Sequence, residues 1–94
     1  MPTTKDLAPE ACADMIARLK RIEGQAKGIQ KMIDEGRGCV DVINQVAALK
    51  AAVNAVSGEM VEAFALKCLR DPSLFESPDK AIEEVVRVIV RNGR

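Results

Sequence analysis

A long apolar repeat between Arg37 and Arg70 limits the folds that this chain can adopt. Apolar residues recur there at steps of four, three, four, three, four and four: Val42, Val46, Leu49, Val53, Val56, Met60 and Phe64. Such a near-heptad repeat is typical of a helix that packs lengthwise on another helix. Gly36 and Gly38 precede the stretch and Asp71-Pro72 follows it, so we expect one long helix between these boundaries.

The segment before this helix has the same repeat, in Met15, Leu19, Ile22, Ala26, Ile29 and Ile33. We expect it to form a helix that begins near Pro9 and ends near Glu35, with Gly36 as the residue that terminates it. Ser77-Pro78 predicts the start of a third helix, which runs to about Arg91. The predicted fold class is therefore all-α, with a long antiparallel helix hairpin and a short C-terminal helix. Residues 1–8 are expected to be a flexible arm, and residues 9–94 a single helical domain.

The composition favours an oligomer. The chain has 94 residues, 48% of them apolar, yet its only aromatic residues are two phenylalanines, so the core must be aliphatic. Helices this long cannot bury their apolar stripes in a compact monomer of this size. The net charge of zero gives no general argument for nucleic acid. We find no continuous apolar run of membrane-spanning length and no signal peptide, and we therefore expect a cytoplasmic protein without a membrane partner.

Cysteines stand near both ends of the predicted long helix. Cys39 and Cys68 are 29 positions apart (68 − 39), so their sulfurs lie roughly 43 Å apart on a straight helix. They cannot meet within one chain. They can meet if two copies pair antiparallel about a two-fold axis near Val53, because Cys39 then faces Cys68 of the partner subunit, twice per dimer. The alternative is that both are ordinary buried small apolar residues.

Thiols are the most usable chemical groups in this sequence. The chain contains no histidine, so it has neither a Ser-His nor a Cys-His pair, and we expect no enzymatic activity. Cys39 lies at a predicted helix start close to Arg37, which favours the thiolate and predicts the more reactive thiol. Cys68 would then act as the resolving partner, whereas Cys12 lies outside the pair.

Basic residues dominate the middle of the first predicted helix. Between Arg18 and Lys31 five basic residues stand against one acid, Glu23. Two helical stripes result, one with Arg18 and Arg21 and one with Lys20, Lys27 and Lys31. Such stripes are either ordinary solvated surface or contacts to nucleic-acid phosphates, and an oligomer would repeat them several times.

Two motifs resemble the copper-sensitive operon repressor family, whose members are called CsoR-like regulators. They are Arg18-Leu-Lys-Arg-Ile-Glu-Gly-Gln25 and Gly38-Cys39-Val-Asp-Val-Ile-Asn-Gln-Val. The resemblance implies a disc-shaped tetramer, built as a dimer of dimers, that binds operator DNA without a helix-turn-helix and leaves it when an effector binds. Its DNA-contacting residues carry over to Arg18, Lys20, Arg21, Lys27, Lys31 and Lys50.

The same resemblance suggests the effector. Copper sensors of this family hold Cu(I) through Cys, His and a second Cys four residues later; Cys39 and Cys68 match the cysteines, and Phe64 takes the histidine position. A chain that has both cysteines but lacks the histidine resembles the persulfide-sensing branch of the family (CstR). That branch forms di- or polysulfide links between protomers and derepresses sulfide-detoxification genes, with no metal cofactor. Alternatives are Cu(I) held by the same two cysteines, and formaldehyde sensing through Pro2 and Cys39.

Overall fold

The computed structural model describes residues 2–92, and these residues form helices and no strand. Three α-helices follow in order: α1 (Pro9–Asp34), α2 (Cys39–Arg70) and α3 (Pro78–Asn92). Two short 3-10 turns, η1 (Thr4–Asp6) and η2 (Pro72–Leu74), precede α1 and join α2 to α3. This confirms the all-α class and the three-helix order that the sequence predicts. The long helix begins at Cys39, two residues later than Arg37.

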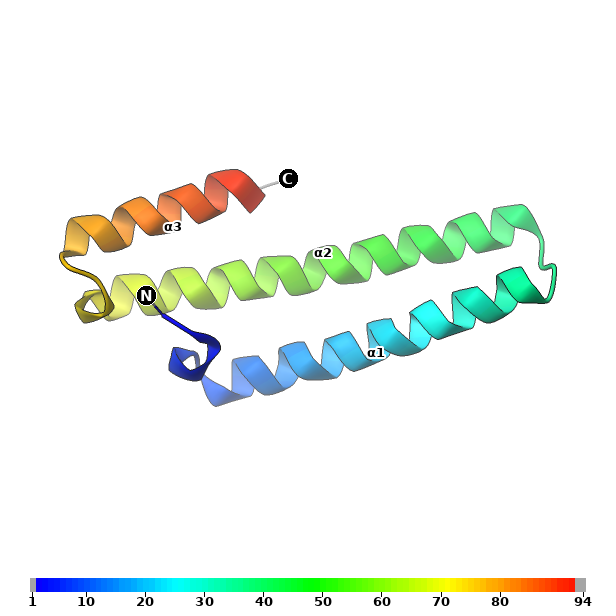
Figure 1. Ribbon diagram of the computed structural model, residues 1–94, viewed down its shortest axis with the longest axis horizontal. Coiled ribbons are helices and arrows are strands. Elements are labelled where there is room, and N and C mark those ends of the chain that lie inside the picture. The colour runs from blue at the N-terminus through cyan, green and yellow to red at the C-terminus, as the bar shows by residue number, and fades with distance from the viewer. Residues whose placement is uncertain (1, 93–94) are drawn as a thin grey trace.

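The three helices lie side by side in a flat array (Figure 1). The helices α1 and α2 form an antiparallel hairpin, and α3 returns along the C-terminal half of α2 on the side opposite α1. The protomer measures 56 × 25 × 14 Å. Its radius of gyration is 17.4 Å, whereas a compact domain of this length has about 12 Å. Within residues 2–92, no helix covers the broad faces of this array, which is 14 Å in its shortest extent.

The hairpin turn is formed by Gly36, which has a φ of 72° in the left-handed region where glycine is favoured. The amide of Gly36 donates to the carbonyl of Ile33 at 3.1 Å, and the amide of Arg37 donates to the carbonyl of Met32 at 2.9 Å. These two bonds satisfy carbonyls at the end of α1, as in a Schellman motif. Gly36 therefore ends the first helix, as the sequence predicts.

The start of α3 is capped by Ser77. Its hydroxyl oxygen accepts from the amide of Lys80 at 3.2 Å, and Pro78 and Asp79 occupy the first turn. A serine cap followed by proline and an acidic residue is what a helix N-terminus favours. This confirms the predicted start of the third helix.

The N-terminal segment contains ordered local structure. Thr3 and Asp6 form a reciprocal capping box around η1, in which the Thr3 amide donates to Asp6 Oδ2 at 2.7 Å. Leu7, which follows, is only 6% exposed. A flexible arm over residues 1–8 and a domain starting at residue 9 stay predictions, and Met1, Gly93 and Arg94 lie outside the described residues.

The buried core of the protomer is small. Its apolar members among the described residues are Leu7, Met15, Ile29, Cys68, Ala81 and Val85. The predicted stripes are buried only in part, because Leu19 and Ile33 on α1 and Val46 and Val53 on α2 are 37% exposed or more. Each long helix has only one long neighbour within the protomer. Its apolar stripe is therefore wider than the surface that this neighbour covers.

The helix α2 is long and apolar enough, by length and composition alone, to cross a membrane. The sequence contains no continuous apolar run of this length, because Lys50 interrupts it, but the helix around Lys50 is apolar on average. A helix that packs against other helices in a soluble protein has the same composition. This property is therefore weak support for a membrane span.

Candidate thiol switch and nucleic-acid interface

The two cysteines of α2 share one face of the helix. The helix is continuous from Cys39 to Arg70, and 29 steps of about 100° bring Cys68 to within roughly 20° of Cys39 around the axis. The structure does not bring the two thiols together within one protomer, since they lie near opposite ends of an unbroken helix. Exposed apolar residues, Ile43 and Val46 among them, lie on the same side of α2 as Cys39.

The two thiols have opposite environments. Cys39 is the first residue of α2 and is exposed, whereas Cys68 has 0% exposure. Burial raises the pKa of the Cys68 thiol, and the negative charge of Glu84 on α3 raises it further. Cys12 is half-buried, and its thiol lies 3.4 Å from the carbonyl oxygen of Thr4. Pro2, the other candidate for effector chemistry, is also half-buried.

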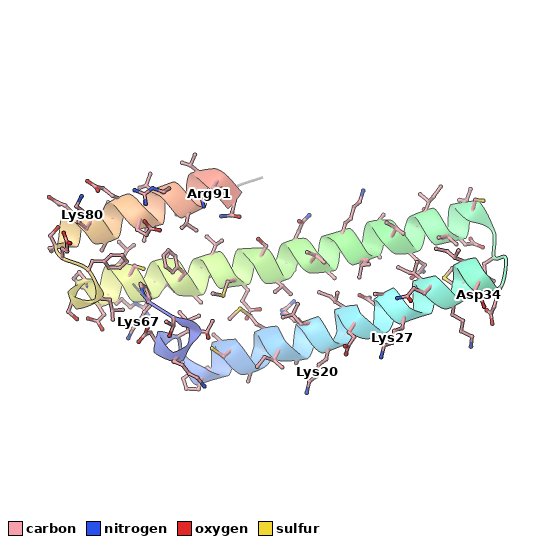
Figure 2. The ribbon with its side chains drawn as sticks, in the orientation of Figure 1. Lys20, Lys27, Asp34, Lys67, Lys80 and Arg91 are labelled. Carbon is pink, nitrogen blue, oxygen red and sulfur yellow. The ribbon has the colours of Figure 1, made fainter. Side chains whose placement is uncertain are left out.

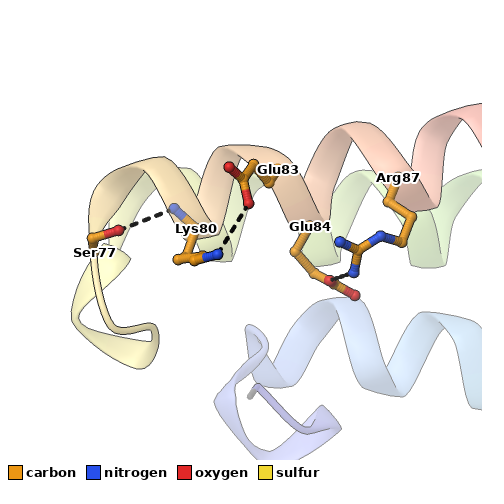
Figure 3. A network of polar contacts seen from close by, with 5 residues as sticks. All are labelled: Ser77, Lys80, Glu83, Glu84 and Arg87. Atoms are coloured by element: carbon orange, nitrogen blue, oxygen red, sulfur yellow. Dashed lines mark hydrogen bonds and ion pairs between the residues drawn. The ribbon is translucent and has the colours of Figure 1, made fainter.

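A set of ion pairs on α3 holds the residues around Glu84 (Figure 3). The Arg87 guanidinium donates to the Glu84 carboxylate, and Lys80 Nζ lies 3.6 Å from Glu83 Oε2. The Glu84 side chain is 20% exposed, which is less than half of the 57% of Arg87. Ala81 and Val85, at 1% and 5% exposure, anchor the same helix on α2. The Glu84 charge that acts on the Cys68 thiol thus belongs to a helix that is fixed both by packing and by charge.

The donor atoms of the chain bear on which metal ion it could bind. No three residues of the types Cys, Asp and Glu come together as a metal-binding group within residues 2–92, and the sequence has no histidine. Phe64 occupies the position where the resemblance expects histidine, and it lines an apolar hollow with Val61 and Val88. Two thiolates from different protomers suit Cu(I) in linear coordination. The imidazole nitrogen that suits nickel is absent from the sequence.

The lysine stripe of α1 faces away from the hairpin. Lys20 and Lys27 project from the side of α1 remote from α2 (Figure 2). Lys31 is also exposed, at 75% of its side chain, and lies 4.0 Å from Glu35. Residues seven and eleven positions after Lys20 lie on the same helical stripe. The structure thus keeps Lys20, Lys27 and Lys31 together on an open surface.

Arg18 and Arg21 lie nearer to α2. With Ile22, Gln25 and Ala52 they line a shallow hollow of about 120 Å³ between the two helices. Arg18 Nε donates to Asp14 Oδ2 at 2.9 Å and lies 3.2 Å from Glu59 Oε1. Lys50 is exposed on α2, away from the stripes of α1. The basic candidates therefore fall into three groups rather than one.

Sequence reasoning missed the two carboxylates that surround Arg18. Asp14 is one turn earlier on α1, a spacing that the sequence shows directly. Glu59 is on α2, and only the pairing of the two helices brings it close. Hydrogen bonding with Asp14 and partial burial raise the pKa of Glu59, while the hydrogen bond from Arg18 lowers the pKa of Asp14.

Comparison with known proteins agrees with this arrangement. Residues 12–91 match the model of the family described as "Metal-sensitive transcriptional repressor". The copper-sensing transcriptional repressor CsoR of Bacillus subtilis is 41% identical over 71 residues, which is 76% of this chain and 70% of that protein.

Two solved structures share the fold. One is the copper-sensing repressor CsoR with Cu(I) from Geobacillus thermodenitrificans. It has a TM-score of 0.72 and 30% identity, covering 100% of this chain and 94% of the other. The other is the nickel-responsive transcriptional regulator InrS. It has a TM-score of 0.74 and 26% identity, covering 85% and 90% of the two chains.

These relatives are transcriptional regulators, in agreement with the prediction that the chain is not an enzyme. The family match extends over all three helices and includes the basic stripes of α1 and both cysteines of α2. The chain belongs to the CsoR family of metal-sensitive transcriptional repressors.

Proposed function

We propose that this repressor senses reactive sulfur species through Cys39 and Cys68 of the partner subunit. The observation that carries the proposal is the pair of thiols on one face of the unbroken α2, in a chain that has no histidine. A head-to-tail pair of α2 helices gives each thiol a partner, and a two-fold axis makes two such sites. Persulfides or polysulfides are the effector, and operator DNA is the partner that the oxidised protein releases.

The exposed Cys39 begins the chemistry. Its thiolate attacks the outer sulfur of a persulfide RSSH, which leaves RSH and a persulfide on Cys39. The Cys68 thiolate of the partner subunit then attacks the inner sulfur of that persulfide and expels hydrosulfide. The sum is two thiols and RSSH giving one disulfide, RSH and H₂S, so the persulfide is the oxidant. A second equivalent of RSSH, used before closure, gives a trisulfide instead.

The flat protomer supports an oligomeric repressor. A domain normally has two packed layers of secondary structure, and this protomer supplies one. A second copy on the exposed face of α2 would supply the other layer, and we propose the dimer and tetramer of the family on this ground. The basic groups Arg18, Arg21, Lys20, Lys27, Lys31 and Lys50 would contact DNA, and a protein that acts on DNA in this way works in the cytoplasm. Binding should weaken steeply with salt, because phosphate contacts release counterions.

The test uses a DNA duplex selected by the purified protein from a random pool. Glutathione persulfide should release the duplex and link two protomers, and intact mass should show whether the link carries extra sulfur. Cys39→Ser and Cys68→Ser should each bind DNA and resist release, whereas Cys12→Ser should behave like the wild type. Release by persulfide in the Cys39→Ser protein would contradict the proposal.

A second candidate is sensing of Cu(I) by the same two thiolates. It is favoured by the similarity to two copper-sensing repressors, and thiolate sulfur suits Cu(I) without histidine. The same assay separates the candidates. Release of the duplex by Cu(I), with no response to persulfide, would establish the copper function and reject the sulfur one.

A further inference from the structure

Arg18 is held between carboxylates from two different helices. Its Nε donates to Asp14 Oδ2 at 2.9 Å and lies 3.2 Å from Glu59 Oε1. Asp14 belongs to α1 and Glu59 to α2, so one nitrogen ties the side chain to both arms of the hairpin. Glu59 Oε1 has almost no solvent exposure and no hydrogen-bond partner of good geometry within residues 2–92. This oxygen therefore relies on the Arg18 charge as its compensating contact.

These contacts leave much of the Arg18 side chain accessible. The nitrogen closest to both carboxylates is Nε, and the side chain is 44% exposed. The two terminal nitrogens of a guanidinium form the planar fork that binds a phosphate through two parallel hydrogen bonds. A side chain that is already fixed at Nε has less rotamer freedom to lose when it binds. The geometry is thus prepared for an anion.

Two carboxylates beside a phosphate site would repel the phosphate if both were ionised. The neighbouring Asp14 carboxyl, followed by partial burial, raises the pKa of Glu59, while the hydrogen bond from Arg18 lowers the pKa of Asp14. Glu59 is therefore the first of the two carboxyls to take up a proton as the pH falls. With Glu59 protonated, the trio of Asp14, Arg18 and Glu59 is neutral overall, whereas ionisation of Glu59 gives it a net negative charge.

The surrounding charges are balanced around this trio. Arg21 acts on it from α1, and Glu62 acts on it from the next turn of α2. A groove of about 640 Å³ runs beside Glu59, between the start of α1 and the end of α2. Its other charged side chains are Asp6, Glu62, Lys67 and Arg70. The charges of these two acids and two bases cancel. The ionisation of Glu59 therefore decides the net charge next to Arg18.

We propose that Glu59 is a positioning residue for DNA binding, which fixes Arg18 from α2 so that its terminal nitrogens meet a phosphate. This inference rests on the proposed function. It adds a direct contact between the helix that carries both cysteines and a residue of the DNA-binding surface. A displacement of α2 along α1 removes the support of Glu59 from Arg18, and this weakens DNA binding without any change in α1 itself.

A double-mutant cycle tests the contact, with the selected DNA duplex as probe at about pH 6, where Glu59 is the more protonated of the two carboxyls. Glu59→Ala should weaken binding about threefold in the wild-type background, a size typical of an exposed pair. In the Arg18→Ala background it should change nothing. Equal effects of Glu59→Ala in both backgrounds, or no effect in the wild type, would overturn the inference.

The pH profile gives a readout that a purely structural role would not change. Wild-type affinity should fall as the pH rises through the raised pKa of Glu59, because Glu59 becomes charged beside the phosphate. Glu59→Gln, which keeps the size and an acceptor oxygen, should bind like the wild type at low pH and show a flatter profile. Glu83→Gln, which removes the charge of an exposed carboxylate on α3, is the control and should keep the wild-type profile. Identical profiles for wild type and Glu59→Gln would reject the role of Glu59.

The two proposals fail differently. If Arg18→Ala binds the duplex as tightly as the wild type, Arg18 is no DNA contact, and the assignment of the DNA surface fails. If Arg18→Ala weakens binding but the cycle shows no coupling, only the role of Glu59 fails. Gel filtration and thermal unfolding of each variant check that the oligomer and the fold are unchanged.

Discussion

At the scale of single residues, the two thiols of α2 differ more than their shared helix suggests. Cys39 is exposed at the first position of the helix, while Cys68 is covered and its pKa is raised by burial and by Glu84. A thiol must be both accessible and deprotonated to attack an electrophile. In the proposed switch, Cys39 should therefore react first and Cys68 should close the link.

This order predicts unequal alkylation. With limiting iodoacetamide at about pH 8, Cys39 should be modified well before Cys68, because the thiolate is the reacting form and only Cys39 is accessible. Peptide mass spectrometry at successive times gives the two rates. The fully unfolded protein in denaturant serves as the control, in which the two rates should converge. Equal rates in the folded protein would contradict the assignment.

The raised pKa of Cys68 also predicts how stability depends on pH. In the unfolded chain the thiol has its ordinary pKa near 9.0. In the folded protein the thiol therefore keeps its proton at a pH where the unfolded chain has lost it. The folded state then binds more protons than the unfolded state. The contribution of Cys68 to the free energy of unfolding is therefore present below about pH 9 and is lost as the pH rises through the pKa of the folded protein. Urea unfolding between about pH 8 and pH 10.5 should show a steeper loss of stability for wild type than for Cys68→Ala. Parallel curves would show that Cys68 is not responsible.

At the scale of helices, the sequence predicts the boundaries closely because the residues that start and end the helices can be recognised in it. Gly36 with its positive φ, Ser77 with its side-chain cap and Pro9 in the first turn each act through local backbone geometry. The sequence also contains a local signal for η1, because Thr3 and Asp6 have capping-box spacing.

Contacts between helices were much harder to predict. Which side of α2 faces α1, and the meeting of Glu59 with Arg18, depend on how two similar apolar stripes rotate against each other. The heptad repeat leaves this rotation open, since Val46 and Val53 belong to the same stripe as Val56 yet remain 37% and 48% exposed. The burial of Cys68 and the approach of Glu84 from α3 likewise depend on tertiary packing, for which the sequence has no local signal.

The packing of α3 gives a prediction at this scale. Val85 is 5% exposed, so Val85→Ala should destabilise the protein by about 1 to 2 kcal/mol through the cavity that it leaves. It should also speed alkylation of Cys68, because α3 is its cover. Glu83→Ala, which removes an exposed ion pair on the same helix, should change stability by at most about 0.5 kcal/mol. Thermal unfolding at fixed protein concentration measures both variants, and unchanged Cys68 reactivity in Val85→Ala would show that α3 is not the barrier.

At the scale of the whole molecule, the flat shape and the small core both point beyond the single protomer. Thirteen large apolar side chains among the described residues are 37% exposed or more, against six buried core residues. Exposed apolar surface of this extent marks an interaction face. We predict that a second copy of the chain covers that face.

The exposed face of α2 should hold the oligomer together. Ile43 is 63% exposed beside the line of the two cysteines, so Ile43→Glu should shift the protein toward monomer and lower its melting temperature. Sedimentation velocity at several concentrations measures the shift. Ala17→Glu places the same charge at an exposed position of α1 and should leave the oligomer intact. An unchanged assembly in Ile43→Glu would place the interface elsewhere.

The uninterrupted course of α2 has one more consequence for a head-to-tail pair. Its two covalent closures would lie at opposite ends of a stiff rod, roughly 43 Å apart, and neither could form in place of the other. A dimer closed at one end only would keep its other end free to pivot. The number of covalent links per dimer at half-maximal DNA release then shows whether one link is enough to release DNA or whether both are required.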